Sequence, residues 1–117
     1  SIINISSTSS KNMGPNIKNG PYGASKAAIN SLTATFSIEL APNIRVNAVA
    51  PGPIPTENFV DSMKMNTPER EEQLKKMINI PLKRWGKPED IGAAVVFMAS
   101  PASGWVTGQC LFVSGGL

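Results

Sequence analysis

The hydrophobic positions of the chain fall into short continuous runs that are separated by longer stretches of helical spacing. Apolar, β-branched runs cover residues 1–6, 44–50 and 109–113, a pattern typical of strands buried on both faces of a parallel sheet. Between them, apolar residues recur about every four positions, which predicts helices over residues 21–40 and 88–100. The positions expected to face the core are Ala28, Leu32, Phe36 and Leu40 in the first helix, and Ile91, Val95, Met98 and Ala99 in the second.

Residues 54–82 form a longer insert whose pattern is less regular. A helix is expected to begin near Thr67, because acidic residues follow it within one turn while Lys75 and Lys76 come later, as the helix dipole favours. The whole order is therefore strand, helix, strand, insert, helix, strand.

This order predicts an α/β fold with three parallel strands, right-handed crossovers and flanking helices. Three parallel strands make a poor isolated sheet, and the first apolar run begins at Ser1 rather than after a methionine. We therefore expect residues 1–117 to be one partial domain, the C-terminal part of a Rossmann-like doubly wound parallel sheet whose N-terminal strands are absent from this sequence.

Composition narrows the class of protein. The 117 residues are 41% hydrophobic and 16% charged, which is typical of an ordered globular chain. The formal net charge of +3 is spread without a run of basic residues, so no nucleic-acid partner is expected, and no apolar stretch approaches the ~18 residues of a membrane span. The chain contains no histidine, and Cys110 is its only cysteine, so we expect no metal site, no disulfide and a cytoplasmic location.

Candidate chemistry centres on Tyr22 and Lys26. Residues four apart share one face of a helix, so the phenol and the ammonium should occupy the same small volume. A cation about 4 Å from a phenolate stabilises it by on the order of 4 kcal/mol at an effective dielectric constant of ~20. Such a tyrosine is a candidate general acid or base, although a surface tyrosine beside a solvated lysine would show the same spacing.

Five segments, in this order, resemble the signatures of the C-terminal half of the short-chain dehydrogenase/reductase family, and the resemblance covers essentially the whole chain. They are Ile3-Asn4-Ile5-Ser6-Ser7, Tyr22-Gly23-Ala24-Ser25-Lys26, Ile44 to Gly52, Arg84-Trp85-Gly86-Lys87-Pro88, and Thr107 to Gly116. The resemblance implies an enzyme, an NAD(P)-dependent oxidoreductase that interconverts a carbonyl and a secondary alcohol by hydride transfer.

The resemblance also implies roles for single residues. Tyr22 would exchange a proton with the substrate oxygen, Lys26 would assist it and bind the cofactor ribose, and Ser7 would donate a hydrogen bond to the substrate oxygen. Ser6, Ser9 and Ser10 are rivals for the role of Ser7, because the loop between Ser7 and Tyr22 is about two residues longer than is usual in the family.

Cofactor binding is expected from Tyr22 and Lys26 and from the loop after the second strand, at Pro51, Gly52, Ile54 and Thr56. The resemblance implies NAD or NADP as the cofactor, and the residues that normally choose between them in the family do not occur in this sequence. The glycine-rich dinucleotide fingerprint is also absent from this sequence. We therefore expect the 117 residues alone to be inactive and poorly folded, and saturable NAD(P)H binding by them would contradict this.

The segment 57–80 lies at the position of the family's substrate lid. Its methionines, with Phe59 and Val60, favour an apolar small-molecule substrate such as a 3-oxoacyl thioester or a steroid. Trp85 and Trp105 are expected to be packing anchors. Family resemblance further implies a homodimer or homotetramer formed through the helix after Tyr22 and through the last helix and strand.

Three alternatives remain open at this point. One is a catalytically idle member of the same fold that serves as a structural or regulatory subunit. Another is an enoyl-thioester reductase, since the turn from Pro51 to Thr56 is similar to one found in such enzymes. The third, a Ser/Lys hydrolase, is raised by several serines near lysines but is disfavoured because neither Gly-x-Ser-x-Gly nor Ser-x-x-Lys occurs.

Overall fold

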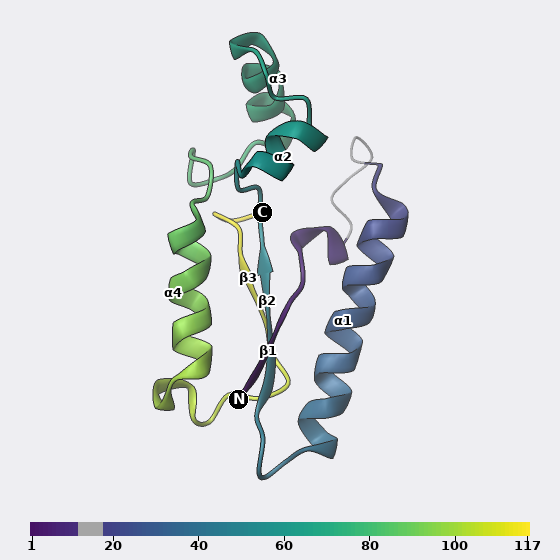
Figure 1. Cartoon of the computed structure of the whole chain (residues 1–117), viewed down its shortest axis with the longest axis vertical. Helices are drawn as coiled ribbons and strands as arrows, with labels where there is room; N and C mark the ends of the chain where they lie inside the picture. Colours follow the sequence, from purple (N-terminus) through teal and green to yellow (C-terminus); the bar gives the residue numbers. More distant parts are fainter. Residues whose placement is uncertain (12–17) are drawn as a thin grey trace.

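The computed structural model describes residues 1–11 and 18–117 and shows a three-stranded sheet between two helices (Figure 1). Helix α1 lies on one side of the sheet and α4 on the other, so the layers are helix, sheet, helix. The elements in order are β1 (Ile2–Ile5), η1 (Thr8–Ser10), α1 (Gly20–Glu39), β2 (Val46–Pro51), α2 (Glu57–Ser62), α3 (Pro68–Ile78), α4 (Pro88–Ala99), η2 (Pro101–Ser103) and β3 (Cys110–Val113).

The sheet has the order β1-β2-β3, and both pairs of neighbouring strands are parallel. Ile2 pairs with Val46 at the start of β1, and Ala48 pairs with Cys110 on the other side of β2. The central strand is buried on both faces, and Val46, Ala48, Val49 and Ala50 are completely inaccessible to solvent. The predicted α/β class and the three parallel strands are confirmed.

The face that helix α1 turns toward the sheet differs from the prediction. The four residues that were expected to face the core are not buried: Leu32 is 49% exposed, Phe36 is 40% exposed, Ala28 is exposed and Leu40 is half-buried. The buried positions of α1 are instead Gly23, Thr33 and Ser37. All three residues are small, and both hydroxyls are bonded within the structure: Thr33 donates to the Ile29 carbonyl and accepts from Asn4 of β1, and Ser37 donates to the Ala34 carbonyl. The helix can therefore lie close to the sheet.

Helix α4 follows its prediction more closely. Met98 is 3% exposed, and Ile91 and Val95 are half-buried beside the strands, but Ala99 points to solvent. The expectation for Trp105 was wrong, because this side chain is completely exposed at the turn after η2. Trp85 does pack, as described below.

The insert is more regular than its sequence suggested, because it folds into the two helices α2 and α3. Helix α3 begins where expected: the Thr67 hydroxyl accepts a hydrogen bond from the Arg70 N–H, and Asn79 ends the helix in the left-handed conformation with φ 37°. Both helices lie beyond the end of the sheet at which β2 finishes (Figure 1). They help to make the chain elongated, with a radius of gyration of 15.4 Å against the ~13 Å expected of a compact domain of this length.

The buried Asn47 joins β2 to the start of β3. Its amide donates to the Val106 carbonyl at 2.9 Å, and its oxygen accepts from the Gln109 N–H at 3.0 Å. Asn47→Ala should lower the free energy of unfolding by about 2 kcal/mol, because two buried backbone groups lose their partners. Urea unfolding of the protein expressed from its complete reading frame would measure this. Asn43→Ala, at an exposed loop asparagine, should change little, and an equal loss in both variants would contradict the prediction.

Candidate active site

The predicted catalytic residues meet where β1 ends and α1 begins. In an open parallel α/β sheet, ligands bind at this carboxyl end of the strands. The Ser6 hydroxyl, just after β1, donates to the Lys26 carbonyl of α1 at 3.2 Å. The start of α1 also lies very close to η1, because a methyl group added to Gly23 would lie 2.6 Å from the Ser9 carbonyl oxygen. Only a glycine therefore lets the first turn of α1 approach η1 so closely.

Tyr22 and Lys26 share one face of the first turns of α1, as their spacing predicted. The Lys26 Nζ lies 5.6 Å from the centroid of the Tyr22 ring. The same ammonium donates to the Ile5 carbonyl at 3.1 Å, which ties it to the end of β1. Tyr22 itself is 51% exposed, so its hydroxyl is accessible to a ligand.

Ser7 lies two residues after the end of β1 and caps η1. Its Oγ accepts a hydrogen bond from the Ser9 N–H at 3.1 Å, an interaction that uses an oxygen lone pair and not the hydroxyl hydrogen. Ser6 is 3% exposed and spends its hydroxyl hydrogen on the Lys26 carbonyl. The Ser9 and Ser10 hydroxyls accept hydrogen bonds from asparagine side chains. Part of the longer loop before Tyr22, residues 12–17, lies outside the described residues.

The segment that begins with the last residue of β2, residues 51–56, is termed the Pro-Gly loop. Gly52 donates to the Val113 carbonyl at 2.9 Å, and a methyl group added to Gly52 would lie 2.7 Å from the Ser114 Cα. The Thr56 hydroxyl caps α2 by accepting from the Phe59 N–H at 3.4 Å. This capping role of Thr56 had not been predicted.

The backbone of the Pro-Gly loop leaves one donor available. Its prolines have no N–H, the Gly52 N–H is used by Val113, and the Thr56 N–H donates to the Ile54 carbonyl at 2.7 Å. Among the residues that the structure describes, no acceptor is bonded to the Ile54 N–H. Within the part of the chain that the structure describes, the Ile54 N–H is therefore the one backbone donor of this loop that has no acceptor.

A cavity of about 310 Å³ lies between the Pro-Gly loop, the end of β3 and the start of α4. Sequence reasoning had not assigned it. Its lining includes Gly52, Ile54, Arg84, Asp90, Val113 and Ser114.

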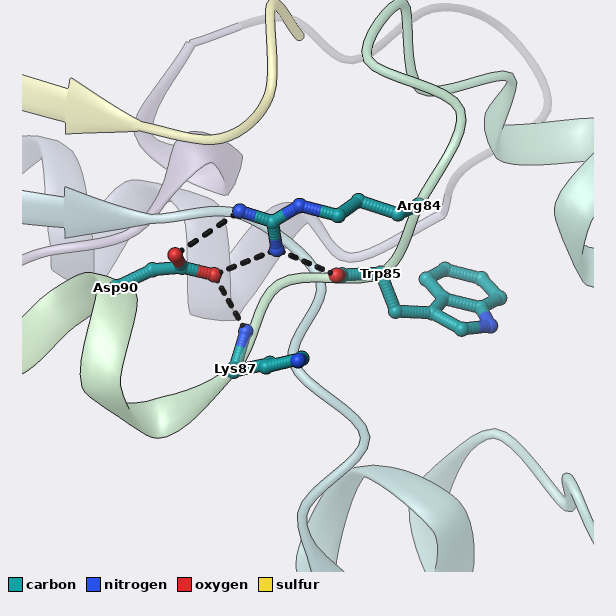
Figure 2. A network of polar contacts seen from close by, with 4 residues as sticks. All are labelled: Arg84, Trp85, Lys87 and Asp90. Atoms are coloured by element: carbon teal, nitrogen blue, oxygen red, sulfur yellow. Dashed lines mark hydrogen bonds and ion pairs between the residues drawn. The ribbon is translucent and has the colours of Figure 1, made fainter.

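Two of the lining residues, Arg84 and Asp90, form an ion pair, which Figure 2 shows. The Arg84 guanidinium donates to both carboxylate oxygens of Asp90, at 2.7 and 2.9 Å, and also to the Trp85 carbonyl. Asp90 accepts a further bond from the Lys87 N–H at 2.8 Å and so caps α4. Arg84, followed by the Lys87 N–H, lowers the pKa of Asp90 to about 2, and the same pair raises the pKa of Arg84.

The depressed pKa of Asp90 predicts a pH dependence of stability. Its contribution is fully present above the ordinary carboxyl pKa of 3.8 and is lost as pH falls toward 2. Asp90→Asn lacks this contribution, so its urea midpoint should fall less steeply than that of the parent between pH 4 and pH 2. High salt should reduce the difference, because the pair is partly exposed. Parallel curves for the two proteins would contradict the prediction.

Among residues 1–11 and 18–117, no helix has both the length and the apolar character needed to cross a bilayer. The same residues bring together no group of three or more potential metal ligands of the His, Cys, Asp and Glu types.

The fold and the site define a Rossmann-type α/β protein with a tyrosine–lysine pair at the carboxyl edge of its sheet. The family model described as enoyl-(acyl carrier protein) reductase matches residues 1–117. The chain belongs to the short-chain dehydrogenase/reductase family.

Curated relatives agree with this assignment. Glucose 1-dehydrogenase 2 of Bacillus subtilis is 43% identical over 117 residues, which cover 99% of this chain and 43% of the relative. The 7alpha-hydroxysteroid dehydrogenase of Escherichia coli K12 is also 43% identical, with 98% of this chain and 43% of the relative covered. The chain thus spans less than half the length of these relatives.

Solved structures show the same correspondence. Ligand-free aldohexose dehydrogenase of Thermoplasma acidophilum superposes with a TM-score of 0.87 at 35% identity, covering 99% of this chain and 47% of that one. A 7 alpha-hydroxysteroid dehydrogenase complexed with NADH and 7-oxo glycochenodeoxycholic acid gives a TM-score of 0.83 at 41% identity, covering 98% and 43%. The predicted family and Rossmann-like fold are therefore confirmed.

Proposed function

We propose that the protein is an NAD(P)-dependent oxidoreductase that interconverts a carbonyl and a secondary alcohol. The observation that carries the proposal is the Tyr22–Lys26 pair, which the Ile5 carbonyl ties to the strand end beside Ser7. Relatives named as dehydrogenases and reductases, and a relative solved with NADH, support both the reaction class and the cofactor.

Three side chains act at the substrate oxygen, each with a different chemical role. The accessible Tyr22 hydroxyl gives its proton to the carbonyl oxygen in reduction and takes one from the alcohol in oxidation. The Lys26 ammonium stabilises the phenolate that remains after proton transfer. Ser7 donates the hydroxyl hydrogen that its cap does not use and so stabilises charge on the substrate oxygen. The buried Ser6 is poorly suited to that role.

The Pro-Gly loop fits a nicotinamide cofactor, whose bound ring would supply or accept the hydride. Gly52 keeps the loop tight against Ser114, and the available Ile54 N–H is suited to the oxygen of a carboxamide. The Thr56 hydroxyl retains its hydrogen for the same group, because its cap to α2 uses a lone pair. Lys26 would hold the ribose hydroxyls.

The substrate class rests on the lid segment, residues 57–80. Phe59, Val60, Met63 and Met65 are half-buried there and Met77 is 41% exposed, which favours an apolar ketone or alcohol such as a steroid or a 3-oxoacyl thioester. Relatives are named for a hydroxysteroid and for a 3-oxoacyl thioester, but also for glucose. The substrate test below therefore includes all three chemistries.

Enoyl-thioester reduction is the second candidate. The description of the matching family model names this reaction. The proton donor Tyr22, set beside Lys26, favours ketone and alcohol chemistry instead. A catalytically idle subunit is disfavoured because Ser7, Tyr22 and Lys26 are all present and no fold requirement explains the three together.

The apolar surface left open by the fold supports a homodimer or homotetramer. Leu32, Phe36 and Ile38 are 40 to 79% exposed on α1, and Val96 and Phe97 are exposed on α4. These are the two helices through which the family resemblance implies subunit contacts.

The decisive experiment is a turnover assay with the protein expressed from its complete reading frame. NADPH and NADH would be supplied with a 7-oxosteroid, a 3-oxoacyl thioester and an enoyl thioester, and NADP and NAD with glucose and a 7α-hydroxysteroid. Consumption or formation of the reduced nicotinamide with a ketone or alcohol supports the proposal. Activity confined to the enoyl thioester would favour the second candidate, and no activity would favour the idle subunit.

A further inference from the structure

Three consecutive residues, Arg84 to Gly86, each contact a different part of the site. Arg84 is fixed to the start of α4 through Asp90 (Figure 2). The Gly86 N–H donates to the Pro53 carbonyl of the Pro-Gly loop at 3.1 Å. Trp85 lies between them, and its ring points away from the ion pair.

Trp85 contacts both helices of the lid segment. Its ring meets the Phe59 ring of α2 edge-on, with centroids 6.0 Å apart and planes at 62°. Its Nε1 donates to the Glu71 Oε1 of α3 at 3.3 Å. Lys75, followed by Trp85, lowers the pKa of Glu71, so the acceptor carboxylate is ionised at neutral pH. One rigid side chain thus joins α2 to α3.

Gly86 lies in close contact with the Pro-Gly loop. A methyl group added there would lie 3.2 Å from Ile54 Cδ1 and 3.3 Å from the Pro53 carbonyl oxygen. Because Ile54 carries the available N–H of the loop, a displacement of the segment 84–86 changes the position of that donor. The Arg84–Asp90 pair supplies a fixed point for such a displacement.

We propose that Trp85 is a positioning residue that couples the lid segment to the Pro-Gly loop, so that cofactor binding at the loop orders α2 and α3 for substrate. This inference rests on the proposed function, because it places the cofactor at the Pro-Gly loop. Trp85 needs no contact with substrate or cofactor in this role. It acts through Phe59 and Glu71 on one side and through its neighbour Gly86 on the other.

Hydrogen exchange measured by mass spectrometry tests the coupling without a known substrate. The protein expressed from its complete reading frame is compared with and without saturating NADH or NADPH, whichever binds more tightly. In the parent, cofactor should slow exchange in the amides of α3 by about fivefold, in the range that one aromatic contact and one hydrogen bond can supply. In Trp85→Leu the slowing should fall below about twofold while the Pro-Gly loop remains protected.

Two further variants separate coupling from mere packing. Trp85→Phe keeps an aromatic contact but loses the bond to Glu71, so an intermediate effect is expected, and this variant decides the matter if Trp85→Leu does not fold. Trp105→Phe changes a fully exposed tryptophan and should behave like the parent. A residue that only packs would speed exchange with and without cofactor equally and leave the cofactor effect intact.

The outcomes are distinct. Full cofactor protection of α3 in both Trp85 variants, or no protection of α3 in a parent that binds cofactor, overturns this inference and leaves the proposed function standing. Failure of the parent to bind either NADH or NADPH overturns the proposed function and this inference with it.

Discussion

Replacing Tyr22 with phenylalanine should lower kcat by about 10² to 10⁴, the range that a positioned general acid or base contributes. The substitution removes the one tyrosine hydroxyl of the chain and keeps the ring that faces Lys26. Tyr22 is half-exposed and its ring is not part of the buried core, so the folded structure should persist. Single-turnover measurements with the active substrate of the turnover assay would give the effect on the chemical step.

A matched control lies three residues away. Ser25→Ala removes an exposed hydroxyl from the same turn of α1, one that donates to the Tyr22 carbonyl, and should change kcat by less than about twofold. NADPH or NADH affinity should also change little in Tyr22→Phe, since Lys26 and the Pro-Gly loop remain. Unchanged turnover in Tyr22→Phe would show that another group supplies the proton.

The three strands and the helices α1, α3 and α4 could be predicted because their signals are local, whereas α2 was not predicted. Buried β-branched runs and prolines at helix starts placed every predicted strand and helix boundary within two residues of the structure. The burial of α1 could not be predicted in the same way. A periodic apolar stripe shows that a helix has an apolar face, but it does not say whether that face meets the sheet of the same chain. The buried positions of α1 are Gly23, which lies against η1, and Thr33 and Ser37.

The residues of the candidate site likewise differ in whether local sequence signals reveal them. The spacing of Tyr22 and Lys26, and the position of Ser7 just after the first strand, can be recognised in the sequence, because each depends on one element. The contacts of Trp85 with Phe59 and Glu71 depend on the path of the whole insert, which carries no local signal. A role for Asp90 at the start of α4 could have been found, since acidic residues in the first turn of a helix interact favourably with the helix dipole.

The Pro-Gly loop should tolerate no side chain at Gly52. Even the Cβ of a substituted residue would lie 2.7 Å from the Ser114 Cα and 2.8 Å from its Cβ, so the loop and the end of β3 must separate. Overpacking of this kind costs about 1–3 kcal/mol. We expect the loop to relieve this overpacking by shifting, which moves the Ile54 N–H. Gly52→Val should then weaken NADPH or NADH binding by up to about a hundredfold.

Gly92→Val is the control, because a Cβ at Gly92 of α4 meets no atom within 4 Å. Cofactor titration by nicotinamide fluorescence, together with urea unfolding of both variants, separates the two places where the strain can appear. Weaker binding with nearly unchanged stability places the strain in the loop, as expected, since β2 and β3 remain paired below Gly52 through Val49 and Leu111. A lower free energy of unfolding in Gly52→Val with normal cofactor affinity would instead show that the strain disrupts the pairing of β2 with β3. It would also show that the Pro-Gly loop does not hold the nicotinamide. If Gly52→Val and Gly92→Val had the same cofactor affinity and the same stability, the site would not require the close approach of Gly52 to Ser114.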